Sequence, residues 1–233
     1  MPAQNIVQAF MVRTATIADL DSLTELHCDS FGPEDHIPVM LGRDYVRATY
    51  RWLTTSSQAY CLVADSDHKI IGLVSVCDRS FTRPMFLACF PEFIRSLLHS
   101  PGLIVTSRLW ERLLRGSAAS EEAKHIVASP GFAQLSVVAV DAKWRGTGIF
   151  QALVEAAKTC SKNRGTLAIR AGVYKFNQAS RRAFAKNGWI ETPQLETADT
   201  VFYVAYLDPE FSKRLGTALE NNPVNARSRC QLQ

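Results

Sequence analysis

The turn Lys143-Trp144-Arg145-Gly146-Thr147-Gly148-Ile149-Phe150 connects an apolar, strand-like segment to a helix-like segment. The strand-like segment is Leu135–Val140, and the helix-like segment is Gln151–Lys158. Free backbone N–H groups gather where a tight glycine turn enters a helix, and the helix dipole adds positive potential there. Arg145 adds a full positive charge. We therefore expect this turn to hold an anionic group such as a pyrophosphate.

Two nucleotide-binding patterns fit this turn poorly. A kinase-type phosphate loop needs a Gly, four residues and then Gly-Lys-Ser/Thr, and the sequence contains no such string. A dinucleotide fingerprint needs a third glycine three residues after Gly148, where Gln151 stands. It also needs an acidic residue about twenty positions further on, where the chain has Ile169-Arg170-Ala171. Both nucleotide interpretations are weak.

The turn and a second segment together resemble a known family. Arg145, Gly148 and Phe150 fall on the Arg/Gln-x-x-Gly-x-Gly/Ala pattern of the acyl-coenzyme A loop in GCN5-related N-acetyltransferases (GNAT). Phe150 departs from that pattern, which has a small residue there. The segment Asn177–Trp189 resembles the family's second motif, an Asn, a helix with an aromatic residue, and then Lys-x-Gly-aromatic. The resemblance extends over about residues 59–206.

The resemblance implies an α/β fold with a GNAT-like mixed, mostly antiparallel central sheet that is splayed and flanked by helices. The splay would lie between the strand that ends near Val140 and the strand that starts near Thr166. Residues 1–215 would form a single acyl-CoA N-acyltransferase domain with a helical insertion at about residues 80–130, and residues 216–233 a flexible tail. Asn177 is expected to cap the helix of the second motif, and Gly188 to end it.

Acetyl-CoA, or another acyl-CoA, is the co-substrate that the resemblance implies. Facing backbone groups of two parting strands lack partners, so they can hydrogen-bond the amides of the pantetheine chain. By the family pattern, the strand before the turn would contact pantetheine, the turn would hold the pyrophosphate, and the motif Asn would contact the coenzyme arm. The expected cofactor-binding residues are Val138, Val140, Arg145, Gly146, Thr147, Gly148, Ile149, Phe150 and Asn177.

A proton donor for the departing thiolate is harder to find in the sequence. Acyl transfer needs a neutral amine, a polarised carbonyl and such a donor. The family often has a Tyr seven residues after the motif Asn, but this chain has Phe184, which has no proton to give. Tyr174 is our catalytic candidate, and Tyr203 is a second one. Either tyrosine could instead serve packing alone.

Glu34 and His36 are the candidate bases. Both lie in the loop Phe31–Pro38, which would wall the acceptor pocket, and His36 titrates near neutral pH. The same charges could instead be solvated loop residues. Asp35 in the same loop, and His27 and Asp29 nearby on the preceding helix, are further candidates for the base. Gln134 and Ser136 on the strand could position a water instead.

We expect an acyltransferase that moves an acetyl or other acyl group from acyl-CoA directly to an amine in a ternary complex. A small-molecule amine is the expected acceptor. Two alternatives stay open. One is a non-catalytic acyl-CoA-binding or regulatory module, slightly favoured by Phe150 and Phe184. The other is an acetyltransferase that acts on protein lysines or N-termini.

Composition argues against several other classes of protein. The 233 residues are 47% hydrophobic and 21% charged, enough for a substantial core. The net charge of +4, without a basic run interleaved with aromatics, does not call for nucleic acid. Six scattered cysteines predict neither a metal site nor a disulfide framework. Without a signal-like N-terminus or an apolar run of about 20 residues, we expect a cytoplasmic protein without a membrane span. Homodimerisation is left open.

Hydrophobic periodicity predicts the remaining elements. The insertion is expected to hold a helical pair that packs an apolar face on the sheet. Because the insertion also carries several arginines, it could alternatively form a lid over the acceptor, or a site for an anionic acceptor or a membrane surface. The expected elements are a strand at Phe10–Arg13, a helix from Thr16, a helix at Arg43–Leu53, a hairpin of Ala59–Ala64 and Ile70–Val76, insertion helices around Phe90–Leu98 and Leu109–Leu114, and a strand at Thr200–Tyr206.

Overall fold

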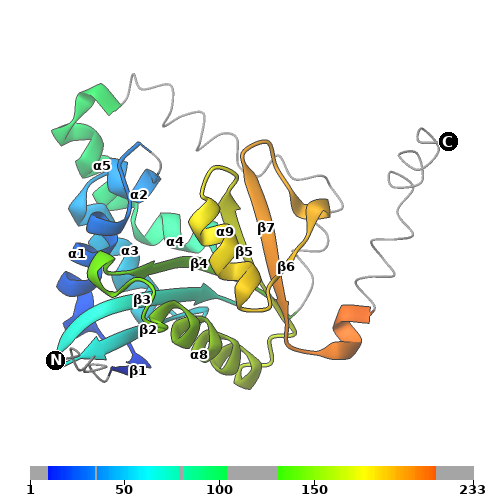
Figure 1. Cartoon of the computed structure of the whole chain (residues 1–233). Coiled ribbons are helices and arrows are strands. Elements are labelled where there is room, and N and C mark those ends of the chain that lie inside the picture. The colour runs from blue at the N-terminus through cyan, green and yellow to red at the C-terminus, as the bar shows by residue number, and fades with distance from the viewer. Residues whose placement is uncertain (1–9, 35, 79–80, 104–130, 214–233) are drawn as a thin grey trace.

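A mixed sheet of seven strands, in the order β1-β2-β3-β4-β5-β7-β6, forms the centre of the fold (Figure 1). The computed structural model describes residues 10–34, 36–78, 81–103 and 131–213. The pair β4–β5 is parallel and the other pairs are antiparallel, which confirms the expected fold class. The strands are β1 Met11–Thr14, β2 Ala59–Ser66, β3 Lys69–Cys77, β4 Phe132–Val140, β5 Ala168–Tyr174, β6 Ile190–Glu191 and β7 Thr200–Tyr206.

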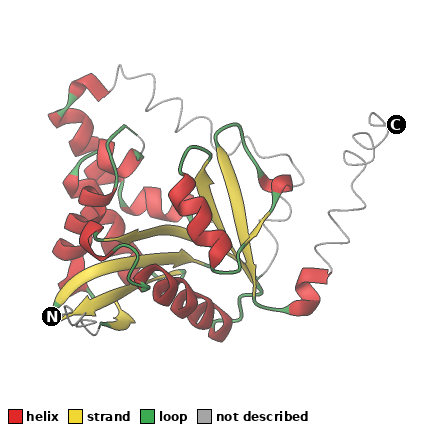
Figure 2. Ribbon diagram, in the orientation of Figure 1, coloured by secondary structure: helices red, strands yellow, loops and turns green. Residues whose placement is uncertain are grey.

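The sheet parts between β4 and β5. These strands pair from Phe132 opposite Ala168 to Leu135 opposite Ala171, and no further. Strand β4 nevertheless continues beside β3 up to Val140, and β5 continues beside β7 up to its last residue. Figure 2 shows the consequence: β2, β3 and β4 run across the view, whereas β5 and β7 stand upright. The predicted splay is confirmed.

Helices cover both faces of the sheet. On β2, Leu62 and Ala64 belong to a core with α8 and α9, whereas the alternate residues Cys61 and Val63 belong to a core with α1 and α3. This is the alternation expected of a strand buried on both faces. The helices are α1 Leu20–Ser30, α2 Ile37–Met40, α3 Arg43–Thr55, α4 Thr82–Ala88, α5 Phe90–His99, α8 Ile149–Asn163 and α9 Gln178–Lys186, with 3-10 turns η1 Ile17–Asp19, η2 Pro101–Leu103, η3 Ala142–Trp144 and η4 Pro193–Leu195.

Most predicted elements are present with small shifts at their ends. The hairpin β2–β3 turns at Asp67 and His68, whose positive φ angles of 49° and 63° suit the twist of a tight hairpin. The helix expected from Thr16 starts as η1, and the α-helix proper begins only at Leu20. The loop expected at Phe31–Pro38 is shorter, because α2 already begins within it.

The insertion packs differently from the prediction. The helix around Phe90–Leu98 is confirmed as α5, but it packs on α3 and not on the sheet. Phe93 lies against Tyr45 of α3, with the two ring centroids 6.5 Å apart. The reason is that α1 and α3 already cover this face of the sheet. The second insertion helix and the tail at 216–233 lie outside the described residues.

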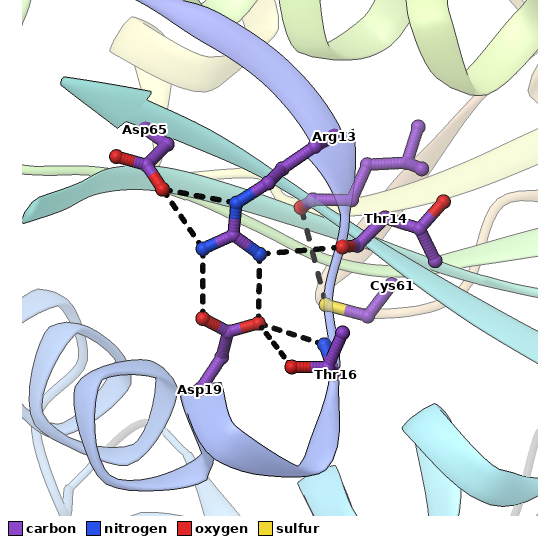
Figure 3. Close-up of polar contacts among 7 residues, drawn as sticks. Arg13, Thr14, Thr16, Asp19, Cys61 and Asp65 are labelled. Carbon is purple, nitrogen blue, oxygen red and sulfur yellow. Dashed lines mark hydrogen bonds and ion pairs between the residues drawn. The ribbon is translucent and has the colours of Figure 1, made fainter. Parts of the chain in front are cut away.

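Arg13 ties the first strand to the start of α1 (Figure 3). Its Nη1 and Nη2 donate to the two carboxylate oxygens of Asp19, both at 2.8 Å, and its Nε donates to Asp65 of β2 at 2.9 Å. Asp19 also accepts the backbone N–H of Thr16 at 2.7 Å. Through these contacts the guanidinium of Arg13 links β1, β2 and the turn η1, which leads into α1. The hydrogen bonds from Arg13 lower the pKa of Asp19 to about 2.

We expect Asp19→Asn to lower the free energy of unfolding at pH 7 by about 1–3 kcal/mol, since it removes charge-assisted hydrogen bonds. Because the pKa of Asp19 is lower in the folded state, its contribution is complete above pH 4 and is lost as the pH falls towards 2. Urea unfolding of the variant should therefore depend less steeply on pH in this window. Asp21→Asn is the control, because the side chain of Asp21 is exposed and its ion pair with Arg47 lies at the surface. Equal losses in both variants would contradict the role of Arg13.

Candidate functional site

The turn before α8 presents unpaired backbone donors. Gly148 is the N-cap of α8 with φ +91°, and Gly146 has φ +83°. Thr147 closes the turn, because its hydroxyl donates to the carbonyl of Trp144 at 2.6 Å. In the part of the chain that the structure describes, no backbone carbonyl accepts from the amides of Gly146, Gly148, Ile149 or Phe150. Donors at a helix N-terminus form an anion-binding site.

The open edge of β4 leads directly to this turn. Asp141 donates its N–H to Ile71 of β3 at 2.9 Å. Since backbone groups alternate between the two edges of a strand, the N–H and C=O groups of Val138 and Val140 face away from β3, towards the split. The side chain of Arg145 reaches back to the same edge, where its Nε donates to the carbonyl of Val140 at 3.3 Å.

A cleft of about 450 Å³ passes through the split and joins the two faces of the sheet. Asn177 and Phe184 of α9 line it on one side, and Phe31 and His36, after α1, on the other. Its middle is formed by residues 134–138 of β4 and 172–174 of β5. A second hollow of about 220 Å³ lies between α3 and α5 and is lined mainly by charged residues. Of the expected cofactor-binding residues, Val138 and Asn177 line the first cleft, whereas Val140 and the turn at 143–150 are not among the described residues that line either hollow.

This combination of glycine turn, parted strands and through-going cleft agrees with the family comparison. The model of the acetyltransferase (GNAT) family matches residues 20–189. The chain belongs to the GNAT family. No curated protein sequence matches the chain.

Solved GNAT structures share the fold at low sequence identity. The PaiA N-acetyltransferase of Thermoplasma acidophilum, in complex with coenzyme A, is 13% identical with a TM-score of 0.56, covering 85% of this chain and 99% of its own. The GNAT domain of S. lividans PAT is 16% identical with a TM-score of 0.55, and the match covers 88% of this chain and 99% of its own. YncA from Salmonella typhimurium, a putative acetyltransferase solved with acetyl-CoA, is 18% identical with a TM-score of 0.53, covering 86% and 95%.

The two departures from the GNAT pattern pack against each other. The ring of Phe150 meets that of Phe184 edge to face, with centroids 5.2 Å apart and an interplanar angle of 84°. Phe184 also packs edge to face on Trp189 at 5.0 Å, and its side chain is almost fully buried. Phe150 therefore packs against Phe184, which occupies the position where GNAT proteins often have a tyrosine.

The structure separates the two tyrosine candidates. Tyr174 ends β5, lines the cleft and stacks on Phe176 with centroids 5.3 Å apart. Tyr203 is buried, and its hydroxyl donates to the carboxylate of Glu191 at 2.6 Å. Tyr203 is not among the described residues that line the cleft. Of the two, Tyr174 is the one that lines the cleft.

The base candidates also separate. His36 lines the cleft, and its Nδ1 lies 3.1 Å from Nε2 of His27. His27 is buried, and its Nδ1 lies 2.8 Å from the hydroxyl of Tyr50. Burial, with a smaller contribution from His36, lowers the pKa of His27 to about 3. Glu34 is exposed and is not among the residues that line the cleft, and Asp35 lies outside the described residues.

The second GNAT motif is formed as expected. The side chain of Asn177 caps α9 by accepting the N–H of Ser180 at 3.0 Å. Gly188 follows the helix with φ +74°, a conformation that favours glycine. Because its carboxamide oxygen is used in the cap, Asn177 has its NH2 group left for a ligand in the cleft.

Some neighbours of the cleft have no local sequence signal. Tyr50 reads as an ordinary core position of an amphipathic helix, and Arg170 as a polar residue within a strand. Their contacts to His27 and Gln134 bridge 23 and 36 positions of the chain.

Among the described residues, five cysteines are free, no cluster of three or more His, Cys, Asp or Glu could hold a metal ion, and no helix is long and apolar enough to span a membrane.

We expect Gly148→Val to lower the affinity for coenzyme A at least tenfold, about 1.4 kcal/mol, as measured by calorimetry. Valine is strained at φ +91°, while a Cβ there would meet no protein atom within 4 Å, so the side chain would occupy ligand space. Gly165→Val is a matched control at the far end of α8, with φ +79° and equally open surroundings. It should lose similar stability and keep its affinity. Unchanged affinity in Gly148→Val would contradict the assignment of the turn.

Proposed function

We propose that this GNAT protein transfers an acetyl or other acyl group from acyl-CoA directly to an amine, with both substrates bound at once. The observation that carries the proposal is that the glycine turn follows the open end of β4, and that the cleft at the split is lined from both faces of the sheet. Donor and acceptor can then approach one point from opposite faces. GNAT relatives solved with coenzyme A or acetyl-CoA support the choice of co-substrate.

The cofactor would be held mainly by backbone groups. The amides of residues 146 and 148–150 would bind the pyrophosphate, with Arg145 as the neighbouring charge and Thr147 keeping the turn closed. The open-edge groups of Val138 and Val140 would pair with the pantetheine amides. The NH2 group of Asn177 would contact the coenzyme arm. Residues 1–215 would then form one acyltransferase domain.

Chemistry at this site would depend on positioning more than on a strong base. Acetyl-CoA supplies the activated thioester. An N–H on the open edge of β4 would polarise the carbonyl, since preorganised donors stabilise the charge that develops there. Tyr174 would donate a proton to the leaving sulfur. His36 would lie on the side of the cleft where the acceptor amine binds. Holding the reactants in line can by itself contribute several kcal/mol, roughly 7–11 in favourable cases.

A small-molecule amine is the acceptor we favour, because the cleft volume of about 450 Å³ is in the range of small-molecule sites. The direct test is coenzyme A release from acetyl-CoA with a panel of small amines, lysine peptides and N-terminal peptides. Turnover with small amines supports the proposal. Tight binding of acetyl-CoA without turnover of any acceptor would mean a binding or regulatory module, and turnover of peptides alone would mean a protein acetyltransferase.

We expect Tyr174→Phe to lower kcat by about 100-fold or more, the usual contribution of a positioned proton donor, while the affinity for acetyl-CoA stays the same. The matched control is Tyr203→Phe, which removes the bond to Glu191 and should lower stability while kcat is retained. Steady-state kinetics of both variants, together with their unfolding midpoints, separates the two roles. If kcat of Tyr174→Phe equals that of the wild type, the thiolate obtains its proton elsewhere.

A further inference from the structure

One face of the paired strands β5 and β7 carries a row of side chains with a single gap. Residues of a strand alternate between the two faces of the sheet. The residues of β5 that belong to the core with α8 and α9 are Ile169, Ala171 and Val173. The opposite face of the pair therefore carries Arg170, Gly172 and Tyr174 of β5, which stand across from Val204, Phe202 and Thr200 of β7. Gly172 is the gap, because it is the one residue of this set without a side chain.

The gap is open although large side chains stand beside it. Gly172 is exposed. The guanidinium of Arg170 lies over the ring of Phe202, 5.5 Å from its centroid, and donates to Oε1 of Gln134 at 2.6 Å. The ring of Tyr174 stacks on another ring, that of Phe176, with an interplanar angle of 7°. The two neighbours of Gly172 along β5 are thus engaged elsewhere.

The walls of the gap are apolar. A Cβ at Gly172 would lie 3.2 Å from Cε1 of Phe202 and 3.3 Å from Cγ2 of Thr200. The edge of an aromatic ring and a methyl group therefore face the place that a side chain at Gly172 would occupy. These three residues and Tyr174 all line the cleft. We call this set of four residues the Gly172 recess.

The charge of the cleft limits what can bind there. Among the residues that the structure describes, its lining includes no Asp, Glu, Lys or Arg. A second ammonium group on the acceptor would find no carboxylate in that lining, and an anionic group would find no cationic side chain. Burying an unpaired charge is costly, so the lining favours an uncharged group.

The same lining is rich in rings. Besides Phe202 and Tyr174, the cleft is lined by Phe31, Phe176 and Phe184. Two aromatic rings attract each other edge to face or offset, beyond the area that they bury. A flat ring on the acceptor would therefore gain more from the edge of Phe202 than an alkyl chain of similar size. Tyr174, the proton donor that we propose, borders the same recess, so a ring bound there lies beside the place proposed for the chemistry.

We propose that the acceptor is an amine joined by a short linker to an uncharged aromatic ring, and that this ring binds in the Gly172 recess. The inference rests on the proposed acyltransferase function and narrows its substrate class. Gly172 determines specificity in this account, because the space that its missing side chain leaves is the space that the ring fills.

A set of amines tests the substrate class. Coenzyme A release from acetyl-CoA would be measured with 2-phenylethylamine, ethylamine, putrescine and β-alanine. Values of kcat/KM would be expressed for the neutral amine, so that differences in amine basicity do not enter. We expect 2-phenylethylamine to be preferred at least tenfold over each of the others, about 1.4 kcal/mol. Equal or faster reaction of any of the other three would overturn the proposal.

The substitution Gly172→Val tests the recess itself. Valine suits a strand, and the φ angle of Gly172 is not positive, so the backbone accepts it. Its methyl groups would fill the recess, and we expect the preference for 2-phenylethylamine over ethylamine to fall at least tenfold. Gly102→Val is the matched control, since Gly102 is also exposed without a positive φ angle and lies outside the described lining of the cleft. The control should keep the preference.

A milder variant covers the case in which Gly172→Val does not fold. Gly172→Ala adds one methyl group, which requires Phe202 and Thr200 to move by only a few tenths of an ångström. We expect it to lower the preference at least threefold. A folded variant at Gly172 that keeps the full preference would contradict the role of the recess.

The position of the ring can be observed without turnover. In the complex with coenzyme A and 2-phenylethylamine, we expect nuclear Overhauser effects from the phenyl protons to the ring of Phe202 and the methyl group of Thr200. Effects to other residues alone would overturn the assignment of the recess. If other amines react better than 2-phenylethylamine, the substrate class is wrong while the acyltransferase proposal stands. If acetyl-CoA binds but no amine reacts, the proposed function fails, and this inference fails with it.

Discussion

The short parallel register between β4 and β5 is the constraint on which the site depends. Only Phe132–Leu135 and Ala168–Ala171 pair, and beyond them each strand keeps a single antiparallel neighbour. Backbone groups are strong donors and acceptors, so the edge of β4 that remains open needs a partner, and an extended chain of amides can provide it. The same parting opens the cleft from one face of the sheet to the other. The binding edge and the meeting point of two substrates that we propose thus depend on one feature of the sheet.

Packing on both faces shapes this opening. On the side of α8 and α9, Phe150 and Phe184 form an aromatic pair that closes the cluster beneath the turn. On the other side, Phe31 and His36 stack beside the buried His27. The aromatic pair replaces the small residue and the tyrosine of the GNAT pattern together, which explains how the chain tolerates both changes. Tyr174, the proton donor that we propose instead, lies on the cleft at the end of β5.

Local features of the chain were predictable from its sequence, because short-range physics determines them. The hairpin, the glycine turn before α8 and the Asn177 cap depend on residues a few positions apart, and each is present. The docking of α5 on α3 was not predictable, since periodicity reveals an apolar face without revealing its partner. The polar chains behind the cleft were missed for a similar reason: Tyr50 with His27, and Arg170 with Gln134, meet only in the folded protein.

Hydrogen exchange of single amides in β4, followed by NMR with and without acetyl-CoA, tests the role of the split edge most directly. The N–H groups of Val138 and Val140 face the split, whereas that of Ala139 faces β3. If pantetheine pairs with the open edge, exchange at Val138 and Val140 slows by about tenfold or more on binding, and exchange at Ala139 changes little. Saturation with acetyl-CoA that leaves both valine amides exchanging as before would contradict the central claim.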